Sequence, residues 1–453
     1  MSKFLVTCWP FEGHVLPQMS IALALRDAGH EVAFYSAERA RTIVEGEGFT
    51  LFPFEQVDPK LYERVQLNEQ QSGMRRQSWK IQQQASRNWL LETVPGQLKD
   101  LRRIIADWQP DVIITDLTMW STQYVLFEAI PIPVAVSSTF MGPLMPGPDA
   151  PPQGLGLPAP KKPWQKALSN AAVKVTELVG LPMRREIDRI RAENGLAPMG
   201  CSVARYPGRL PLYLIANLRP LDWNRQDLGP SVHYIGPTIY HPPEKPGTVD
   251  WLATVPTDRP WVHVTEGTSH YQEPFVLQAA ARGLGGCDFE AILTTGGSRD
   301  PEQLGLTPLP KNVHVTRWLS HTDLLPRCEV VVTTGGPATI MASLRAGVPL
   351  VIVPTTWDKP DNASRIVEAD LGVKLAPRHC TPDGLRAAIE RVLTEPHFRT
   401  NARRVAAELN AAPGPAGAVH LLEQLVQNPS DRSAVDAHAV ADAAASKLTK
   451  ESA

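Results

Sequence analysis

A histidine is expected in the first loop of the chain, in the segment GHVLP, shortly after the apolar stretch KFLVTCW. The side chain of His14 has a pKa near neutrality, so it can accept a proton from a hydroxyl group. Such a base needs a carboxylate on its other ring nitrogen. Asp116 ends a second apolar stretch, DVIITD, and the two residues meet at one sheet edge if both stretches are parallel strands. Taken alone, a loop histidine is more often a surface or capping residue.

A second feature is the segment VVTTGGPATIMASLRAGVP, in which a strand-like run meets two glycines and then a helical stretch. Gly335 and Gly336 permit a sharp turn with positive φ and leave no Cβ in the way of a ligand. Pro337 suits the first turn of a helix, where its missing N–H is not needed. The remaining N–H groups of that turn favour an anion, above all a phosphate. Close packing of strand against helix would also explain the glycine pair.

The elements that must position these residues alternate between short apolar strands and amphipathic helices. Strands are expected in the segments KFLVTCW, EVAFYS, FTLFPF, DVIITD and IPVAVSS, with helices between them. Beyond residue 247 the alternation resumes with PWVHVTEGT, FEAILTTGG, NVHVTRW, CEVVVTTGG, VPLVIVP and GVKLAP. This order predicts an α/β fold with two halves, each with parallel strands joined by right-handed crossovers.

The domain boundaries are expected where this alternation stops. The pattern predicts an N-terminal domain (residues 1–218), a Pro/Gly-rich linker (219–247) and a C-terminal domain (248–400). It further predicts C-terminal helices that pack back on the N-terminal domain (401–427) and a disordered tail (428–453). The Pro/Gly-rich segment MGPLMPGPDAPPQGLGLPAPKKP within the first domain is expected either to cover a binding cleft or to be mobile.

The composition excludes several classes of protein. The chain has 453 residues with a formal net charge of -2, so it lacks the basic footprint of a nucleic-acid-binding protein. Five scattered cysteines, without a CxxC pair or a Cys/His cluster, indicate neither a disulfide framework nor a zinc site. The N-terminal apolar run is too short for a signal peptide, and no stretch approaches the ~20 apolar residues of a membrane-spanning helix. These observations favour a cytoplasmic protein.

Around the glycine pair the chain resembles the nucleotide-sugar-dependent glycosyltransferases of family 1, which have the GT-B fold. The resemblance is carried by RWLSHTDLLPRCEVVVTTGGPATIMASLRAGVPLVIVPTTWDKPDNASRI, which is similar to the family's donor-binding signature. GEGFT, RDAGHEVAFYS and PDVIITD are similar to the family's N-terminal domain. Over residues 1–427 the resemblance implies two Rossmann-like α/β domains that face each other across a cleft.

The resemblance implies a donor site in the C-terminal domain. Trp318 would stack on the nucleotide base, and Asp358 would accept hydrogen bonds from sugar hydroxyls. Without the resemblance, a core position would be the preferred explanation for Trp318. The donor-binding positions implied by the family signature are Gly267, Thr268, Ser269, Trp318, Leu319, Thr334, Gly335, Gly336, Thr339, Asp358, Lys359 and Asn362.

For the N-terminal domain, the resemblance implies that His14 is the catalytic base and Asp116 its partner. The expected reaction moves a sugar, with inversion, from a UDP- or dTDP-sugar to a hydroxyl of a small hydrophobic acceptor resembling a natural product. Neither a metal nor a tightly bound cofactor is expected. The acceptor is expected to contact apolar side chains of the 61–150 region, namely Trp79, Trp89, Trp120, Phe140 and Met141.

Five residues depart from the family pattern in the donor site. Thr334 stands where a histidine usually donates to the diphosphate, and Ala342 where a glutamate usually binds the ribose. Lys359 and His321 each replace a glutamine, and Ala338 replaces a glycine. Thr334 can still donate one hydrogen bond, about half as strong as that of a charged group. Loss of the glutamate removes acceptors worth about 1–3 kcal/mol in a buried site.

Two interpretations of these departures remain open. The first is an unusual donor, for example one with an acidic sugar that pairs with Lys359. The second is a degenerate homologue that acts as a small-molecule-binding or accessory protein. The presence of His14 together with Asp116 favours the transferase, because a pure binding protein needs no base. A GT-B epimerase or phosphorylase is a third alternative, although an epimerase would be expected to carry several acidic and basic groups near the nucleotide.

Overall fold

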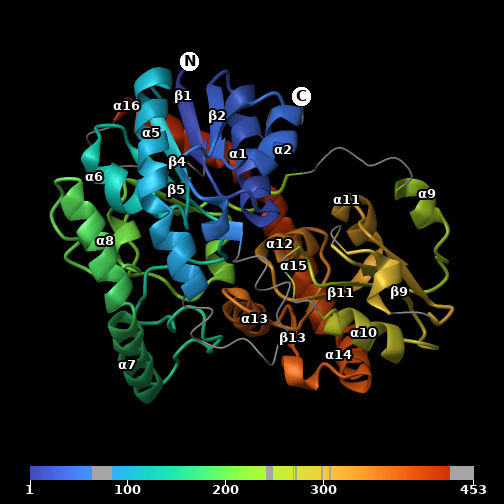
Figure 1. Ribbon diagram of the computed structural model, residues 1–453. Coiled ribbons are helices and arrows are strands. Elements are labelled where there is room, and N and C mark those ends of the chain that lie inside the picture. The colour runs from blue at the N-terminus through green and yellow to red at the C-terminus, as the bar shows by residue number, and fades with distance from the viewer. Residues whose placement is uncertain are drawn as a thin grey trace.

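The structure, a computed structural model, describes residues 1–63, 84–240, 248–268, 270, 273–296, 299–305 and 308–428. An N-terminal lobe, blue to green, lies beside a C-terminal lobe, yellow to orange (Figure 1). Two of the predicted site residues, Trp79 and Ser269, lie outside the described residues. So do residues 241–247 of the predicted linker and residues 429–453 of the predicted tail.

The N-terminal lobe is built on a parallel sheet of seven strands in the order β3-β2-β1-β4-β5-β6-β7. The strands are β1 (Lys3–Thr7), β2 (Glu31–Ser36), β3 (Thr50–Pro53), β4 (Val112–Asp116), β5 (Val134–Ser138), β6 (Leu212–Ile215) and β7 (Val232–Tyr234). Helices bury β1, β4 and β5 on both faces, which explains their nearly continuous apolar runs. The strand order reverses between β1 and β4, so their carboxyl ends open a crevice of the kind that binds ligands in α/β sheets.

Helices cover both faces of this sheet. The helices of the lobe are α1 (Glu12–Asp27), α2 (Arg41–Gly46), α5 (Val94–Trp108), α6 (Phe127–Ala129), α7 (Pro163–Val179) and α8 (Leu181–Glu193). Apolar side chains of α1 and α2 pack on one face, and those of α5 and α8 pack on the other. A π-helical turn at Asn88–Glu92 precedes α5. Such turns are frequent at functional sites, and this one carries Trp89.

The C-terminal lobe repeats this plan with six parallel strands in the order β10-β9-β8-β11-β12-β13. The strands are β8 (Trp261–Thr265), β9 (Glu290–Thr294), β10 (Val313–Thr316), β11 (Cys328–Thr333), β12 (Leu350–Ile352) and β13 (Gly372–Lys374). Here the order reverses between β8 and β11, which opens a second crevice at their carboxyl ends. The prediction of two parallel-sheet α/β domains is therefore confirmed.

The remaining helices belong to the C-terminal lobe, except the last. They are α9 (Thr248–Ala253), α10 (Phe275–Gly283), α11 (His321–Leu324), α12 (Pro337–Arg345), α13 (Lys359–Glu368), α14 (Pro382–Thr394), α15 (Pro396–Ala411) and α16 (Gly414–Gln427). α15 packs in the C-terminal core beside α12, whereas α16 packs against α1 in the N-terminal lobe. Within the described residues, no helix has both the length and the apolar character required to cross a membrane.

The segment predicted as an interdomain linker contains part of the first lobe. β7 lies inside residues 219–247 and pairs with β6, so the N-terminal sheet extends to Tyr234. The strand has only three residues and lies between Pro230 and Gly236. Its short apolar pattern was hidden by the surrounding prolines and glycines.

Buried polar contacts join the two lobes. Arg365 of α13 donates from Nε to Oδ1 of Asp222 at 2.8 Å, and both side chains are almost inaccessible to solvent. The Arg365 guanidinium also lies 3.8 Å from the centre of the Trp223 ring. Asp361 of α13 accepts hydrogen bonds from the backbone N–H groups of residues 154 and 156 in the Pro/Gly-rich segment. That segment is thus packed against α13, and α13 is held in place relative to the N-terminal lobe.

Candidate active site

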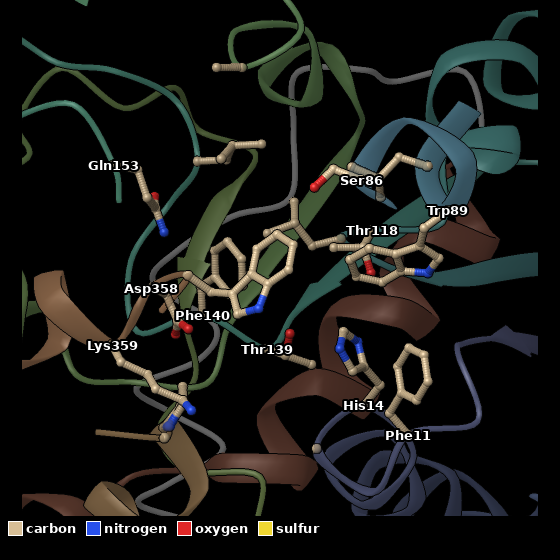
Figure 2. Close-up of a pocket in the computed structure, with 18 of the residues that line it drawn as sticks. Phe11, His14, Ser86, Trp89, Thr118, Thr139, Phe140, Gln153, Asp358 and Lys359 are labelled. Carbon is tan, nitrogen blue, oxygen red and sulfur yellow. The ribbon is translucent and has the colours of Figure 1, made fainter. Parts of the chain in front are cut away.

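The two crevices open into a single cavity of about 960 Å³ between the lobes. Residues after strands β1, β4 and β5 line it from the N-terminal lobe, and residues after β8, β11 and β12 line it from the C-terminal lobe. In Figure 2, His14, Phe11 and Trp89 lie on one side of the cavity, and Asp358 and Lys359 lie on the other. The GHVLP segment and the segment with the glycine pair therefore contribute to one site.

His14 and Asp116 form the predicted pair at the N-terminal crevice. The Nδ1 atom of His14 lies 2.8 Å from Oδ2 of Asp116. The Asp116 carboxylate is inaccessible to solvent, whereas the His14 side chain keeps 18% exposure, toward the cavity. The other carboxylate oxygen accepts hydrogen bonds from the N–H of Thr118 at 2.8 Å and from its hydroxyl at 2.5 Å. These bonds hold Asp116 in one orientation and leave Nε2 of His14 as the basic nitrogen.

The surroundings of His14 set its protonation. Burial lowers the pKa of the imidazole, but the charge of Asp116, its hydrogen bond and the charge of Asp358 outweigh this effect, so the pKa is raised above 6.5. The rings of Phe11 and Trp89 lie edge-on to the imidazole, with centroid distances of 5.7 and 6.2 Å. Asp358 lines the same cavity from the C-terminal lobe, so both lobes contribute charged groups to it.

Three of the predicted acceptor residues, Trp89, Trp120 and Phe140, line the cavity. Met141 does not line it, since its side chain is 1% exposed and packs in the core of the C-terminal lobe. Its neighbour in sequence, Phe140, lines the cavity instead. The sequence gives no signal for which of the two side chains enters the core.

Sequence reasoning overlooked Trp357, which lines the cavity from the C-terminal lobe directly before Asp358. Its ring lies edge-on to that of Trp89, with 5.9 Å between the centroids, so the aromatic wall crosses the interface between the lobes. Trp357 has a φ of 59°, a left-handed conformation that costs a bulky residue roughly 1–3 kcal/mol. Phe11 was overlooked as well, although it lies three residues before His14. The prediction that GHVLP is a loop is wrong, since α1 begins at Glu12 and His14 lies in its first turn.

In the donor half of the site, the predicted residues that line the cavity are Gly267, Thr268, Thr334, Gly336, Thr339, Asp358 and Lys359. α12 begins behind the glycine pair, and no side chain caps its first turn. The N–H groups of that turn are therefore suited to bind an anion. The pKa of Asp358 is raised, because the effect of burial exceeds the opposite effect of its hydrogen bond with Asn362.

The other predicted donor residues lie outside this lining. Asn362 donates to the carbonyl of Gly335 and to Oδ2 of Asp358, both at 2.9 Å, so it holds the turn and the carboxylate in place. Leu319 is 4% exposed and packs in the core of the C-terminal lobe. Trp318 is half-buried in the loop between β10 and α11 and is not among the lining residues.

Thr334 has a different partner from the one expected. Its hydroxyl donates to the backbone carbonyl of Glu266 at 3.0 Å. A hydroxyl has a single proton to donate, so in this arrangement Thr334 does not offer a hydrogen bond to a phosphate. Glu266 is itself held by Arg299, whose guanidinium lies 2.6 Å from the carboxylate.

Replacement of Gly335 by alanine is expected to destabilise the C-terminal lobe by about 1–2 kcal/mol, because a left-handed backbone is unfavourable for a residue with a Cβ. Gly335 has a φ of 98°, and an added Cβ would lie 3.0 Å from Cγ2 of Ile352. Thermal unfolding of the purified variant measures the loss. Gly336→Ala is the matched control, since Gly336 has a φ of -65° and no atom within 4 Å of an added Cβ. Equal unfolding temperatures would show that the turn tolerates a side chain.

Comparisons with known proteins agree with this architecture. Residues 280–425 match the profile of the erythromycin biosynthesis protein CIII-like C-terminal domain. The 4'-demethylrebeccamycin synthase of Lentzea aerocolonigenes is 31% identical over 428 residues, which are 94% of this chain and 100% of that protein.

Two solved structures share the fold across almost the whole chain. The calicheamicin glycosyltransferase CalG4 superposes with a TM-score of 0.69 at 19% identity, covering 95% of this chain and 99% of that one. The spinosyn rhamnosyltransferase SpnG, in complex with thymidine diphosphate, gives 0.65 at 20% identity, covering 93% and 100%. The predicted GT-B fold is confirmed, and the chain belongs to the nucleotide-sugar-dependent glycosyltransferases of family 1.

Proposed function

We propose that this enzyme transfers a sugar, with inversion, from a nucleotide diphosphate sugar to a hydroxyl of a hydrophobic natural-product acceptor, with His14 as the base. The observation that carries this proposal is the 2.8 Å pair of His14 and Asp116, which faces the start of α12 across one cavity. A base and an anion-binding helix start on opposite sides of a cleft are what a displacement at a sugar carbon requires.

The reaction follows from this arrangement. The Nδ1–H of His14 is donated to Asp116, so Nε2 takes the proton of the acceptor hydroxyl. The acceptor oxygen attacks the anomeric carbon, and the bond from that carbon to the diphosphate oxygen breaks. The diphosphate leaves with the bonding electrons, toward the N–H groups at Gly336. The buried carboxylate of Asp116 stabilises the imidazolium that forms.

The shape and chemistry of the cavity support a large apolar acceptor. Aromatic side chains of Phe11, Trp89, Trp120, Phe140 and Trp357 surround the acceptor side. A volume of about 960 Å³ lies near the upper end of the usual range for ligand pockets. The similar proteins named above include a 4'-demethylrebeccamycin synthase and a calicheamicin glycosyltransferase.

The donor is proposed to be a dTDP-sugar or a UDP-sugar. The spinosyn rhamnosyltransferase, which shares the fold, was crystallised with thymidine diphosphate. In this chain Asp358 lines the cavity and is oriented by Asn362, so its carboxylate can accept hydrogen bonds from sugar hydroxyls. We retain Trp318 as the residue that stacks on the nucleotide base, on the strength of the family signature.

A transfer assay tests this function. The purified enzyme is incubated with dTDP-glucose or UDP-glucose and a panel of polycyclic and macrolide acceptors that carry a free hydroxyl. Mass spectrometry then detects an acceptor that has gained one hexose. We expect a product from at least one acceptor of this panel. Absence of product from the whole panel, together with no binding of either nucleotide, would contradict the proposal.

The pH dependence of the reaction provides a further prediction. His14 must be neutral to act as a base, and its pKa is raised above 6.5. The value of kcat/KM is therefore expected to fall as the pH decreases through a pKa above 6.5. In Asp116→Asn the acid limb of the residual activity should shift to lower pH. The charge that raises the pKa of His14 is gone in this variant, while burial still lowers that pKa. An acid limb that does not move in this variant would contradict the assignment.

A further inference from the structure

We infer, on the basis of the proposed function, that the ammonium group of Lys359 supplies the positive charge that holds the diphosphate of the donor. The family places a histidine at position 334 for contact with the diphosphate, and this chain has a threonine there. Because the hydroxyl of Thr334 donates to the carbonyl of Glu266 at 3.0 Å, it cannot replace that histidine as a donor. A compensating donor therefore has to come from another residue beside this turn.

Lys359 lies in an unusual place for a lysine. It is the first residue of α13 and is 7% exposed, yet it lines the cavity. The N-terminus of a helix favours anions, so a cation is unfavourable there. An anion bound beside Lys359 would be stabilised by both the ammonium and the helix start.

The backbone brings Lys359 next to the diphosphate side of the site. A Cβ added to Gly335 would lie 3.3 Å from Cβ of Lys359, so the lysine side chain starts against the glycine turn. Its Nζ atom donates to Oγ1 of Thr355 at 3.1 Å. Thr355 follows β12, whose continuation at Val353 hydrogen-bonds to Thr333 at the end of β11. The ammonium is therefore held at the carboxyl ends of β11 and β12, beside the start of α12.

Lys359 differs in charge from the other residues around the donor site. Of the described residues of the C-terminal lobe that line the cavity, Lys359 is the one with a cationic side chain. Lys174 and Arg184 also line the cavity, but they belong to α7 and α8 of the N-terminal lobe.

Calorimetric titration of the full chain with dTDP, UDP and their nucleosides tests this inference. We expect Lys359→Met to bind the nucleoside diphosphate at least 10-fold more weakly than the wild type, with nucleoside affinity unchanged. Lys359→Arg should restore most of the affinity, because it keeps the charge. The wild-type affinity should also fall more steeply with added NaCl than that of Lys359→Met. The variants' unfolding temperatures show whether each protein remains folded.

The outcomes separate this inference from the proposed function. Equal diphosphate affinities of wild type and Lys359→Met would overturn the inference and leave the glycosyltransferase site intact. If the substitution weakened only UDP-glucuronate and left UDP unaffected, the ammonium would contact the sugar, and the inference would also be wrong. Absence of nucleotide binding by the wild-type protein would overturn the proposed function and this inference together.

Discussion

His14→Ala is expected to lower kcat by about 10²–10⁴-fold, the usual contribution of a general base. The affinity for the nucleotide donor should remain within about twofold, because the donor contacts lie in the other lobe. Asp116→Asn is expected to cause a loss of the same order. An asparagine presents an N–H or a carbonyl where His14 needs a carboxylate, so it neither enforces the correct tautomer nor stabilises the imidazolium.

A matched control comes from a second histidine–carboxylate pair. His314 and Glu290 are 2.8 Å apart, like His14 and Asp116, but neither lines the cavity. His314→Ala should therefore retain full activity. Steady-state transfer rates, measured at saturating donor, compare the three variants. A His14→Ala enzyme with more than about half the wild-type kcat would show that His14 is not the base.

Asp222→Asn is expected to lower the free energy of unfolding by about 3–5 kcal/mol, the usual cost of removing one partner from a buried ion pair. The substitution leaves the guanidinium of Arg365 buried without its charge partner. Tyr234 also donates to Asp222, at 2.6 Å, and an asparagine oxygen can still accept that bond. Urea-induced unfolding measures the change, and activity should fall because α13 carries Lys359 and begins directly after Asp358.

Two further variants make this prediction specific. Asp222→Asn combined with Arg365→Met removes both charges and should recover much of the lost stability. Glu408→Gln breaks an exposed pair with Arg404, whose side chains are 40% and 60% exposed, and should change stability by less than about 1 kcal/mol. If the double variant were as unstable as Asp222→Asn alone, burial of an unpaired charge would not be the cause.

The general architecture could be predicted because strands and helices alternate with distinct periodicities. The same pattern placed His14 after β1 and Asp116 at the end of β4, and neighbouring parallel strands bring such ends together. The structure confirms their contact at 2.8 Å. Local sequence is sufficient here because each residue lies within a few positions of a strand end.

Contacts between the lobes could not be predicted in this way. Asp222 and Arg365 are 143 positions apart, and Asp222 belongs to no motif. The direction of a side chain in an irregular loop is equally hidden. Met141 enters the C-terminal core while Phe140 lines the cavity, and Trp357 reaches across to Trp89 from the opposite lobe. Such arrangements depend on how two folded lobes meet, which periodicity does not encode.

The anomeric configuration of the product tests the central claim most directly. A single displacement by an acceptor oxygen, activated by His14, must invert the sugar carbon. From an α-linked dTDP- or UDP-glucose the account therefore predicts a β-glycoside, recognised by its large coupling between the first two sugar protons in the proton NMR spectrum. An α-glycoside would indicate retention, and it would contradict direct attack by an acceptor deprotonated at His14.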